Sequence, residues 1–151
     1  MRYLCITDGM LAENCYLLLD EASGEAAVID PGFVNDRLLG EIAKYKVRWI
    51  LLTHGHFDHI EGVDRLRALT GAPSAAFRTE GAFAADPAQN GSLLMFGRPI
   101  ACTVDRLLED GETIHVGAVP VQVMHTRGHT AGGCCYVTPE AVFTGDTLMG
   151  Y

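Results

Sequence analysis

The segment that most constrains this chain is residues 53–59, in which three histidines and one aspartate follow directly after an apolar run at 49–52. The run is typical of a buried strand, and the polar cluster begins where that strand should end. In open α/β sheets, binding and chemistry lie beyond the carboxyl ends of the strands. Imidazole and carboxylate groups packed into one turn at such a place predict a metal site, with His54, His56, Asp58 and His59 as candidate ligands.

The composition is that of one globular domain. The chain has 151 residues, of which 48% are hydrophobic and 20% charged, enough for a single core. The formal net charge of −8 disfavours a nucleic-acid surface, which requires clustered Lys and Arg. No segment approaches the roughly 18 apolar residues of a membrane span, and the N-terminus does not resemble a signal peptide.

The cysteines indicate a reducing compartment. There are five of them, and no C-x-x-C spacing, so they predict neither a disulfide framework nor a zinc knuckle. Free cysteines within predicted strands behave as small apolar residues. We therefore expect a cytoplasmic protein whose partner is a small-molecule substrate, with no nucleic acid and no membrane, and with homo-oligomerisation left open.

Local patterns predict a mixed α/β chain. The first half favours strands at 3–7, 14–20, 26–29 and 47–53, and helices at 35–45 and 59–69. Asn35 or Asp36 can cap the first helix, and Gly71 marks the end of the second. The second half favours a short strand at 75–77, a helical turn at 81–85, a loop at 86–92, and strands at 113–116, 119–124, 134–137 and 141–144.

Two later loops each carry one further ligand-type residue beside a glycine. His129 follows the predicted strand at 119–124, and Asp146 follows the predicted strand at 141–144. Because the fold brings strand ends together, His129 would complete a first site with the 54–56 pair. Asp146 could then bridge to a second site.

The ligands and their spacing predict a two-metal centre in compressed form. Nitrogen and oxygen donors without thiolate suit Zn²⁺ first, with Fe²⁺ or Mn²⁺ as alternatives. Two divalent ions that share a water lower its pKa towards neutrality, so the site would supply hydroxide to an electrophilic carbonyl. Asp58 would hold the proton of that nucleophile as well as binding the metal.

The motif H-x-H-x-D-H at 54–59 resembles that of the metallo-β-lactamase fold superfamily. With the segments 14–16, 28–32, 128–130 and 143–148, it resembles the hydroxyacylglutathione hydrolase-like (glyoxalase II-like) branch more narrowly. The resemblance implies a four-layer αββα sandwich with the metals at one edge between the sheets. It also implies that His54, His56 and His129 bind one metal, while Asp58, His59 and bridging Asp146 bind the other.

The resemblance also carries departures. Family members continue past the T-G-D-T motif, supply a further histidine to the second site, and add a last helix over the second sheet. Arg127 stands where a proline usually precedes the G-H-T loop, and the sequence given ends at Tyr151. We therefore expect one metallo-β-lactamase-like domain over 1–151, truncated at its C-terminus and lacking its final helix and strand segment.

The resulting function hypothesis is a metal-dependent hydrolase of a thioester, of the acylglutathione kind. The alternatives are a mononuclear iron persulfide dioxygenase, an RNA-processing nuclease disfavoured by charge, and a truncated metal-binding module without activity. Asp30 is open between a turn residue and a residue that supports the site. Among the remaining polar residues, His125 favours a core or supporting role, His115 an exposed position, and Arg127 a solvated loop over a contact to an anionic substrate.

Overall fold

The structure is a computed structural model that describes residues 1–9, 13–127, 130 and 132–145. Within these residues, ten strands form two sheets. The first sheet has the order β1 (Arg2–Asp8), β2 (Glu13–Asp20), β3 (Glu25–Ile29), β4 (Lys46–Leu51), β5 (Ser74–Phe77) and β6 (Arg106–Leu108). The second has the order β10 (Val142–Phe143), β9 (Cys134–Val137), β8 (Val119–His125) and β7 (Thr113–Val116).

The two sheets differ in strand direction. β1, β2 and β3 pair antiparallel, whereas β3, β4, β5 and β6 run parallel. The second sheet is antiparallel throughout. The parallel half is made by helical connections, which are α1 (Asp36–Ile42), α2 (Phe57–Ile60), α3 (Val63–Thr70), α4 (Glu80–Ala85) and α5 (Ser92–Phe96).

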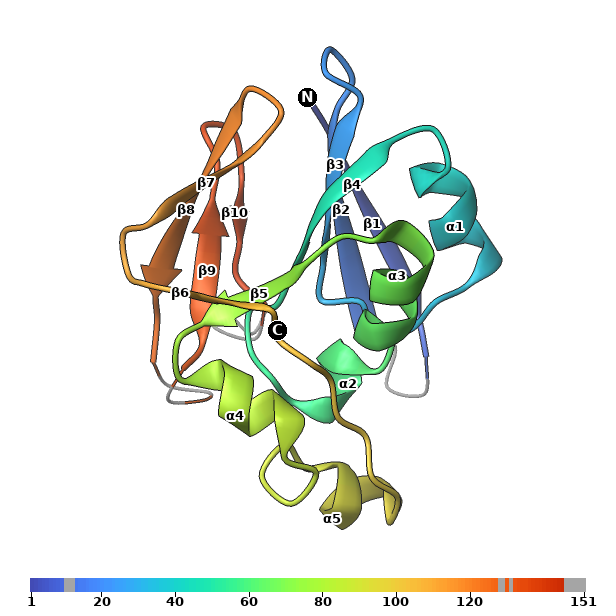
Figure 1. The fold of residues 1–151 in the computed structure, drawn as a ribbon, viewed down its shortest axis with the longest axis vertical. Coiled ribbons are helices and arrows are strands. Elements are labelled where there is room, and N and C mark those ends of the chain that lie inside the picture. Colours follow the sequence, from blue (N-terminus) through green and yellow to red (C-terminus); the bar gives the residue numbers. More distant parts are fainter. Residues whose placement is uncertain (10–12, 128–129, 131, 146–151) are drawn as a thin grey trace.

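The sheets face each other, and α1 and α3 lie on the outer side of the first sheet (Figure 1). One apolar cluster fills the space between this sheet and the helices, and it includes Leu17, Val28, Leu38 and Leu66. A second cluster lies between the sheets, where Ile29 and Leu51 meet side chains such as Val121 and Tyr136. Among the described residues, no helix covers the outer face of β7–β10 (Figure 1), so the described layers are α, β and β.

The predicted strands are confirmed, with small changes at their ends. The strand that delivers the 53–59 motif ends at Leu51 rather than at residue 53. The first helix ends at Ile42 rather than at residue 45, and its cap is Asn35, whose Oδ1 accepts a hydrogen bond from Leu38 N at 2.8 Å. The prediction missed α5 and β6, both of which are short.

The single helix predicted at 59–69 is wrong. The structure has α2 and α3 instead, with a break at Gly62. Gly62 N donates to Pro31 O at 2.8 Å, and a Cβ at Gly62 would lie 2.7 Å from the carbonyl oxygens of Pro31 and Phe33. Residues 31–33 therefore pack closely against Gly62, where the helix is interrupted. Gly71 caps α3 with a φ of 71°, as expected.

All five cysteines are free thiols. Cys15, Cys102, Cys134 and Cys135 are buried, and Cys5 is exposed on β1. No helix within the described ranges is long and apolar enough to cross a membrane.

Candidate metal centre

Three parallel strands place polar side chains at one edge of the first sheet. Because β3, β4 and β5 are parallel, their carboxyl ends meet at this edge. Asp30 follows β3 directly, the turn at 53–56 follows β4, and Glu80 opens α4 shortly after β5. The edge therefore collects two carboxyl groups around the histidine turn.

The candidate ligands of the 54–59 motif form one cluster. The ring centroid of His54 is 4.2 Å from that of His59 and 5.0 Å from that of His56. His54 and His59 are 2% and 7% exposed, and Asp58 Oδ2 lies 3.5 Å from His59 Nε2. Two donors on one tetrahedral zinc ion are about 3.4 Å apart, given bonds of about 2.0–2.2 Å. The spacing and the donor chemistry of these residues therefore fit a divalent metal ion.

Asp30 is buried beside the cluster and accepts a hydrogen bond from its backbone. The residue is 1% exposed. Its Oδ1 accepts a hydrogen bond from Thr53 N at 2.8 Å, and its Oδ2 accepts one from Thr53 Oγ1 at 2.6 Å and lies 3.1 Å from His59 Nδ1. Asp30, His54 and His59 bring ligand-type atoms within 4.8 Å of one another. Since both oxygens of Asp30 already accept hydrogen bonds, we interpret it as the orienting partner of His59 and not as a ligand.

The same contacts set the tautomers of two histidines. A carboxylate only accepts, so the Thr53 hydroxyl gives its proton to Asp30. Thr53 Oγ1 then accepts from His54 Nδ1, which is 3.1 Å away. His59 Nδ1 lies 3.1 Å from Asp30 Oδ2, and a carboxylate at this distance favours the tautomer that carries the proton on Nδ1. Both rings therefore carry their proton on Nδ1 and present Nε2, the unprotonated nitrogen that can bind a metal.

Two hydrogen bonds join the second sheet to the backbone at the start of this turn. Cys134 N donates to Thr53 O at 2.8 Å, and the Tyr136 hydroxyl donates to Leu52 O at 2.5 Å. Burial raises the pKa of Tyr136 well above its usual value and that of the Cys134 thiol to about 12. Both groups thus remain protonated, which suits them as donors that fix the turn and not as nucleophiles.

Two predicted ligands, His129 and Asp146, lie outside the described residues. Their described neighbours approach the motif. Thr130 Oγ1 donates to Oε1 of Glu80, the first residue of α4, at 2.9 Å. A Cβ at Gly145 would lie 2.3 Å from Thr53 Oγ1. Thr130 therefore contacts Glu80 and Gly145 lies close to Thr53, while the ligand roles of His129 and Asp146 stay predictions.

A hollow of about 350 Å³ opens beside His56. Ala82 and Phe83 form an apolar part of its wall, and Gln89 and Thr130 contribute polar groups. The Phe83 ring packs on His56 with centroids 5.3 Å apart. A small organic molecule could therefore lie against the motif with an apolar group on Phe83.

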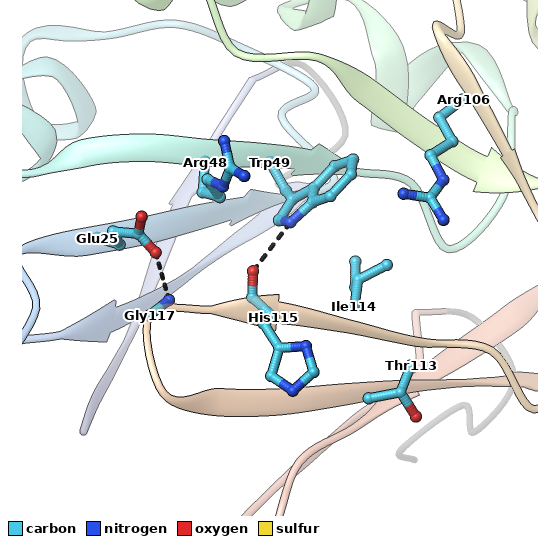
Figure 2. Close-up of a pocket in the computed structure, with 8 residues that line it drawn as sticks. All are labelled: Glu25, Arg48, Trp49, Arg106, Thr113, Ile114, His115 and Gly117. Carbon is cyan, nitrogen blue, oxygen red and sulfur yellow. Dashed lines mark hydrogen bonds between the residues drawn. The ribbon is translucent and has the colours of Figure 1, made fainter.

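A second hollow, of about 410 Å³, is lined by different residues (Figure 2). Trp49 Nε1 donates to His115 O at 3.0 Å, and Gly117 N donates to Glu25, so these contacts join β4 and β3 to the β7–β8 hairpin. The Arg106 guanidinium lies 5.5 Å from the Trp49 ring centroid. His115 takes part here through its carbonyl, and its ring points away from Trp49 (Figure 2), which separates it from the predicted ligands.

The other polar residues singled out in the sequence have structural contacts or solvent exposure. His125 is half-buried, stacks on Phe77 at 4.0 Å between centroids, and donates through its backbone N to Asp110 at 2.9 Å. Arg127 is exposed. These placements agree with a core role for His125 and a solvated position for Arg127.

The sequence prediction missed the roles of Thr53 and Glu80. The sequence pattern predicts Thr53 only as the end of a strand, yet its hydroxyl joins Asp30 to His54. Glu80 is 1% exposed, and its Oε1 accepts a hydrogen bond from Gly55 N at 2.8 Å. The signal available was position, since both residues lie within a few residues of the end of a parallel strand.

The sequence matches one protein family and several known proteins. A profile described as the metallo-beta-lactamase superfamily matches residues 8–150. An uncharacterised protein of Aquifex aeolicus is 36% identical over 143 residues, which cover 93% of this chain and 68% of the relative. The probable polyketide biosynthesis zinc-dependent hydrolase PksB of Bacillus subtilis is 31% identical over 137 residues, which cover 89% of this chain and 55% of that protein.

Solved structures show the same fold. The BLEG-1 B3 metallo-beta-lactamase superposes with a TM-score of 0.90 at 33% identity, covering 99% of this chain and 74% of that one. ETHE1 from Myxococcus xanthus gives 0.78 at 28%, covering 99% and 59%. TTHA1623 in a di-iron-bound form gives 0.79 at 29%, covering 97% and 73%. The profile match over nearly the whole chain, with these relatives and the shared fold, shows that the chain belongs to the metallo-beta-lactamase superfamily.

Proposed function

We propose that this protein is a metal-dependent hydrolase of thioesters, with acylglutathiones as the first substrate class to test. The observation that carries the proposal is the pair of His59 Nε2 and Asp58 Oδ2 at 3.5 Å, beside the buried His54 ring. Superfamily membership and the similarity to PksB, which is named a zinc-dependent hydrolase, support the hydrolase part. The thioester part rests on the sequence resemblance to the glyoxalase II-like branch.

The residues of the motif have separate tasks in this proposal. Divalent metal, when bound, supplies a hydroxide at neutral pH by lowering the pKa of its water. His54 presents Nε2 because its Nδ1 donates to Thr53 Oγ1, and the Asp30 carboxylate near His59 Nδ1 favours the same tautomer of that ring. The Asp58 side chain is 22% exposed, so it can face the metal and also reach a proton at the open side of the cluster.

Two ions are proposed, one held by the 54–56 pair with His129 and one by Asp58 and His59 with Asp146. Zinc is favoured by the name of PksB, and iron by the di-iron form of TTHA1623. Nitrogen and oxygen donors accept either metal.

The hollow beside His56 provides a place for the acyl group. Its apolar wall at Ala82 and Phe83 suits a short acyl chain, and Gln89 can donate to or accept from a polar substituent. A carbonyl held here would lie next to the histidine turn, where a bound metal would supply hydroxide.

A second candidate function is the iron-dependent oxidation of a persulfide. The fold similarity to ETHE1 from Myxococcus xanthus is consistent with it. The fold similarity to BLEG-1, named a B3 metallo-beta-lactamase, adds a β-lactam as a third electrophile to include in the test.

The test combines metal content with a substrate panel. The purified protein, loaded with Zn²⁺ or Fe²⁺, is given S-lactoylglutathione, a chromogenic cephalosporin, or glutathione persulfide under oxygen. Thioester turnover that requires metal and is lost in Asp58→Asn is expected, whereas His115→Ala should retain it because His115 lies in the second hollow.

Three other outcomes contradict the proposal. Oxygen uptake with persulfide and one iron per chain would assign the dioxygenase. Turnover of the cephalosporin alone would assign lactam hydrolysis. Metal binding without turnover of any of the three would favour a metal-binding module.

A further inference from the structure

Glu80 is a buried carboxyl group that the ligand motif does not include. It opens α4, the helix that follows β5, and is 1% exposed. Its Oε1 accepts two hydrogen bonds, from Gly55 N at 2.8 Å and from Thr130 Oγ1 at 2.9 Å. A carboxyl group removed from water is unfavourable unless polar partners compensate it, so these two donors account for its position.

The two donors come from different parts of the fold. Gly55 lies between His54 and His56, in the turn that follows β4 of the first sheet. Thr130 lies in the connection from β8 to β9 of the second sheet and directly follows the predicted ligand His129 in sequence. One oxygen atom of Glu80 therefore joins the two segments that must come together for a shared metal site.

Close packing on both sides of α4 supports the same view independently. A Cβ on Gly55 would lie 2.8 Å from Ala84 Cβ and 3.0 Å from Ala84 N. A Cβ on Gly132 would lie 2.3 Å from Glu80 Oε2 and 2.5 Å from Thr79 Oγ1. Helix α4 therefore packs closely between the two segments, with Ala84 against Gly55 and the Glu80 side chain against Gly132.

We propose that Glu80 is a positioning residue of the metal centre, which holds the 54–56 turn next to Thr130 of the connection from β8 to β9. The inference rests on the metal centre of the proposed function and on none of its substrates. Glu80 does not touch the metal in this assignment, because its Oε1 is directed to Gly55 N and Thr130 Oγ1. Its effect is to fix the backbone from which the ligands project.

The test compares Glu80→Ala and Glu80→Gln with a matched control, Asp20→Ala. Asp20 is also buried and also joins the two sheets, since its Oδ2 accepts from Ser23 Oγ at 2.8 Å and from Ala118 N at 3.2 Å. It lies at the end of β2, in the β2–β3 hairpin at the opposite end of the sandwich from α2 and α4 (Figure 1). Both carboxyl groups should contribute to the melting temperature, but only Glu80 should affect metal binding.

Zinc affinity is measured by competition with a chelating dye, and the ligand field by the visible spectrum of the Co²⁺ form. Glu80→Ala is expected to weaken zinc binding by about 10- to 100-fold and to alter the Co²⁺ bands. Glu80→Gln keeps an acceptor oxygen, so it should recover most of the lost affinity. Asp20→Ala should leave the affinity and the spectrum unchanged while it lowers the melting temperature.

A second pair of variants reaches the contact from the other side. Thr130→Val removes the hydroxyl that donates to Glu80 at nearly constant volume, and Thr130→Ser keeps it. Weaker zinc binding in the valine variant alone is expected. If Glu80→Ala or Thr130→Val folds and binds zinc as tightly as the unmodified protein, Glu80 has only a structural role. A protein that binds no metal at all overturns this inference together with the proposed function, whereas bound metal without thioester turnover leaves this inference intact.

Discussion

Asp30 offers the sharpest test of how this edge of the sheet works. It has a φ of 54°, which is unusual for a residue with a side chain, and it follows β3 directly. Its carboxylate accepts from Thr53 N and Thr53 Oγ1 and lies 3.1 Å from His59 Nδ1. Asparagine tolerates a left-handed backbone, so Asp30→Asn changes the hydrogen-bond pattern with little added strain.

The expected effect of Asp30→Asn falls on two histidines. The amide oxygen must face Thr53 N, so the amide nitrogen takes the place of Oδ2. That nitrogen donates where Oδ2 accepted, and its N–H group near His59 Nδ1 favours the tautomer in which Nδ1 carries no proton. Thr53 Oγ1 also accepts from the amide and turns its proton to His54 Nδ1. Both rings would move their proton to Nε2 and lose the lone pair that binds metal.

The magnitude follows from the role of such partners in metal sites. Losing an orienting partner weakens metal binding by about 10- to 100-fold, or roughly 1.4–2.8 kcal/mol. Zinc competition measures the affinity, and imidazole ¹⁵N shifts of the metal-free protein report the tautomers directly. Asp20→Asn serves as the control with a buried carboxyl group elsewhere. Zinc binding as tight as in the unmodified protein, or Nδ1–H tautomers that persist in Asp30→Asn, would refute the reasoning.

Alanine and glycine at position 30 separate the backbone from the carboxylate. Both remove the carboxylate, which should destabilise the protein by about 3–5 kcal/mol because two buried donors of Thr53 lose their hydrogen-bond partner and His59 loses a neighbouring charge. A positive φ also destabilises the alanine variant by roughly 1–2 kcal/mol. Glycine loses more conformational freedom on folding, which offsets roughly 0.5–1 kcal/mol of that difference. Asp30→Gly should therefore be more stable than Asp30→Ala, by about 0.5–1 kcal/mol in urea denaturation. An alanine variant more stable than the glycine variant by about 0.5–1 kcal/mol would show that the left-handed backbone carries no strain.

Three further predictions concern packing, pH and thiol reactivity. Gly55→Ala should lose about 1–3 kcal/mol in urea denaturation because its Cβ would meet Ala84 at 2.8 Å, whereas Gly40→Ala, in α1 with nothing within 4 Å, should gain about 0.5–1 kcal/mol. The hydrogen-bonded Arg67 guanidinium lowers the pKa of Asp105 from its ordinary value near 3.8 to about 2. This exposed pair therefore stabilises the fold above pH 3.8. Its contribution of about 1 kcal/mol or less is lost as the pH falls towards 2. Asp105→Asn should abolish that part of the acid dependence, and an unchanged acid transition would contradict it. Iodoacetamide at pH 8 should label Cys5 alone among the five cysteines of the native protein, as read by peptide mass spectrometry. Cys5 is exposed, whereas burial raises the pKa values of Cys102 and Cys134 to about 12. Rapid labelling of Cys102 or Cys134 would contradict their burial.

Much of the fold follows from local patterns because its strands are strongly apolar. The run at 15–19 and the run at 49–52 are buried in the structure except for Tyr16 and Trp49, which are half-buried. Boundaries failed where tertiary contacts decide them. The break at Gly62 depends on the carbonyl groups of Pro31 and Phe33, about thirty residues away in sequence, and no local pattern contains that contact.

Local pattern predicts the histidine turn but not the contacts that support it. A cluster of ligand types within a few residues is visible in any sequence, but the partner that fixes each ring comes from another strand. Asp30 reaches His59 across 29 positions of sequence, and Thr130 reaches Glu80 across 50. Such pairings require the strand order, which periodicity alone does not give.

The strand order was nevertheless within reach, and it identifies which polar residues belong to the site. Strands and helices alternate from 26 to 77, which is typical of a parallel sheet, and parallel strands put their carboxyl ends at one edge. Asp30 and Glu80 then belong beside the histidine turn for the same reason. In the antiparallel second sheet only alternate ends face that edge. β8 ends and β9 begins there, since Cys134 N donates to Thr53 O, whereas β7 ends at the other side. The connection between β8 and β9 therefore keeps His129 as a candidate ligand, and the same geometry removes His115.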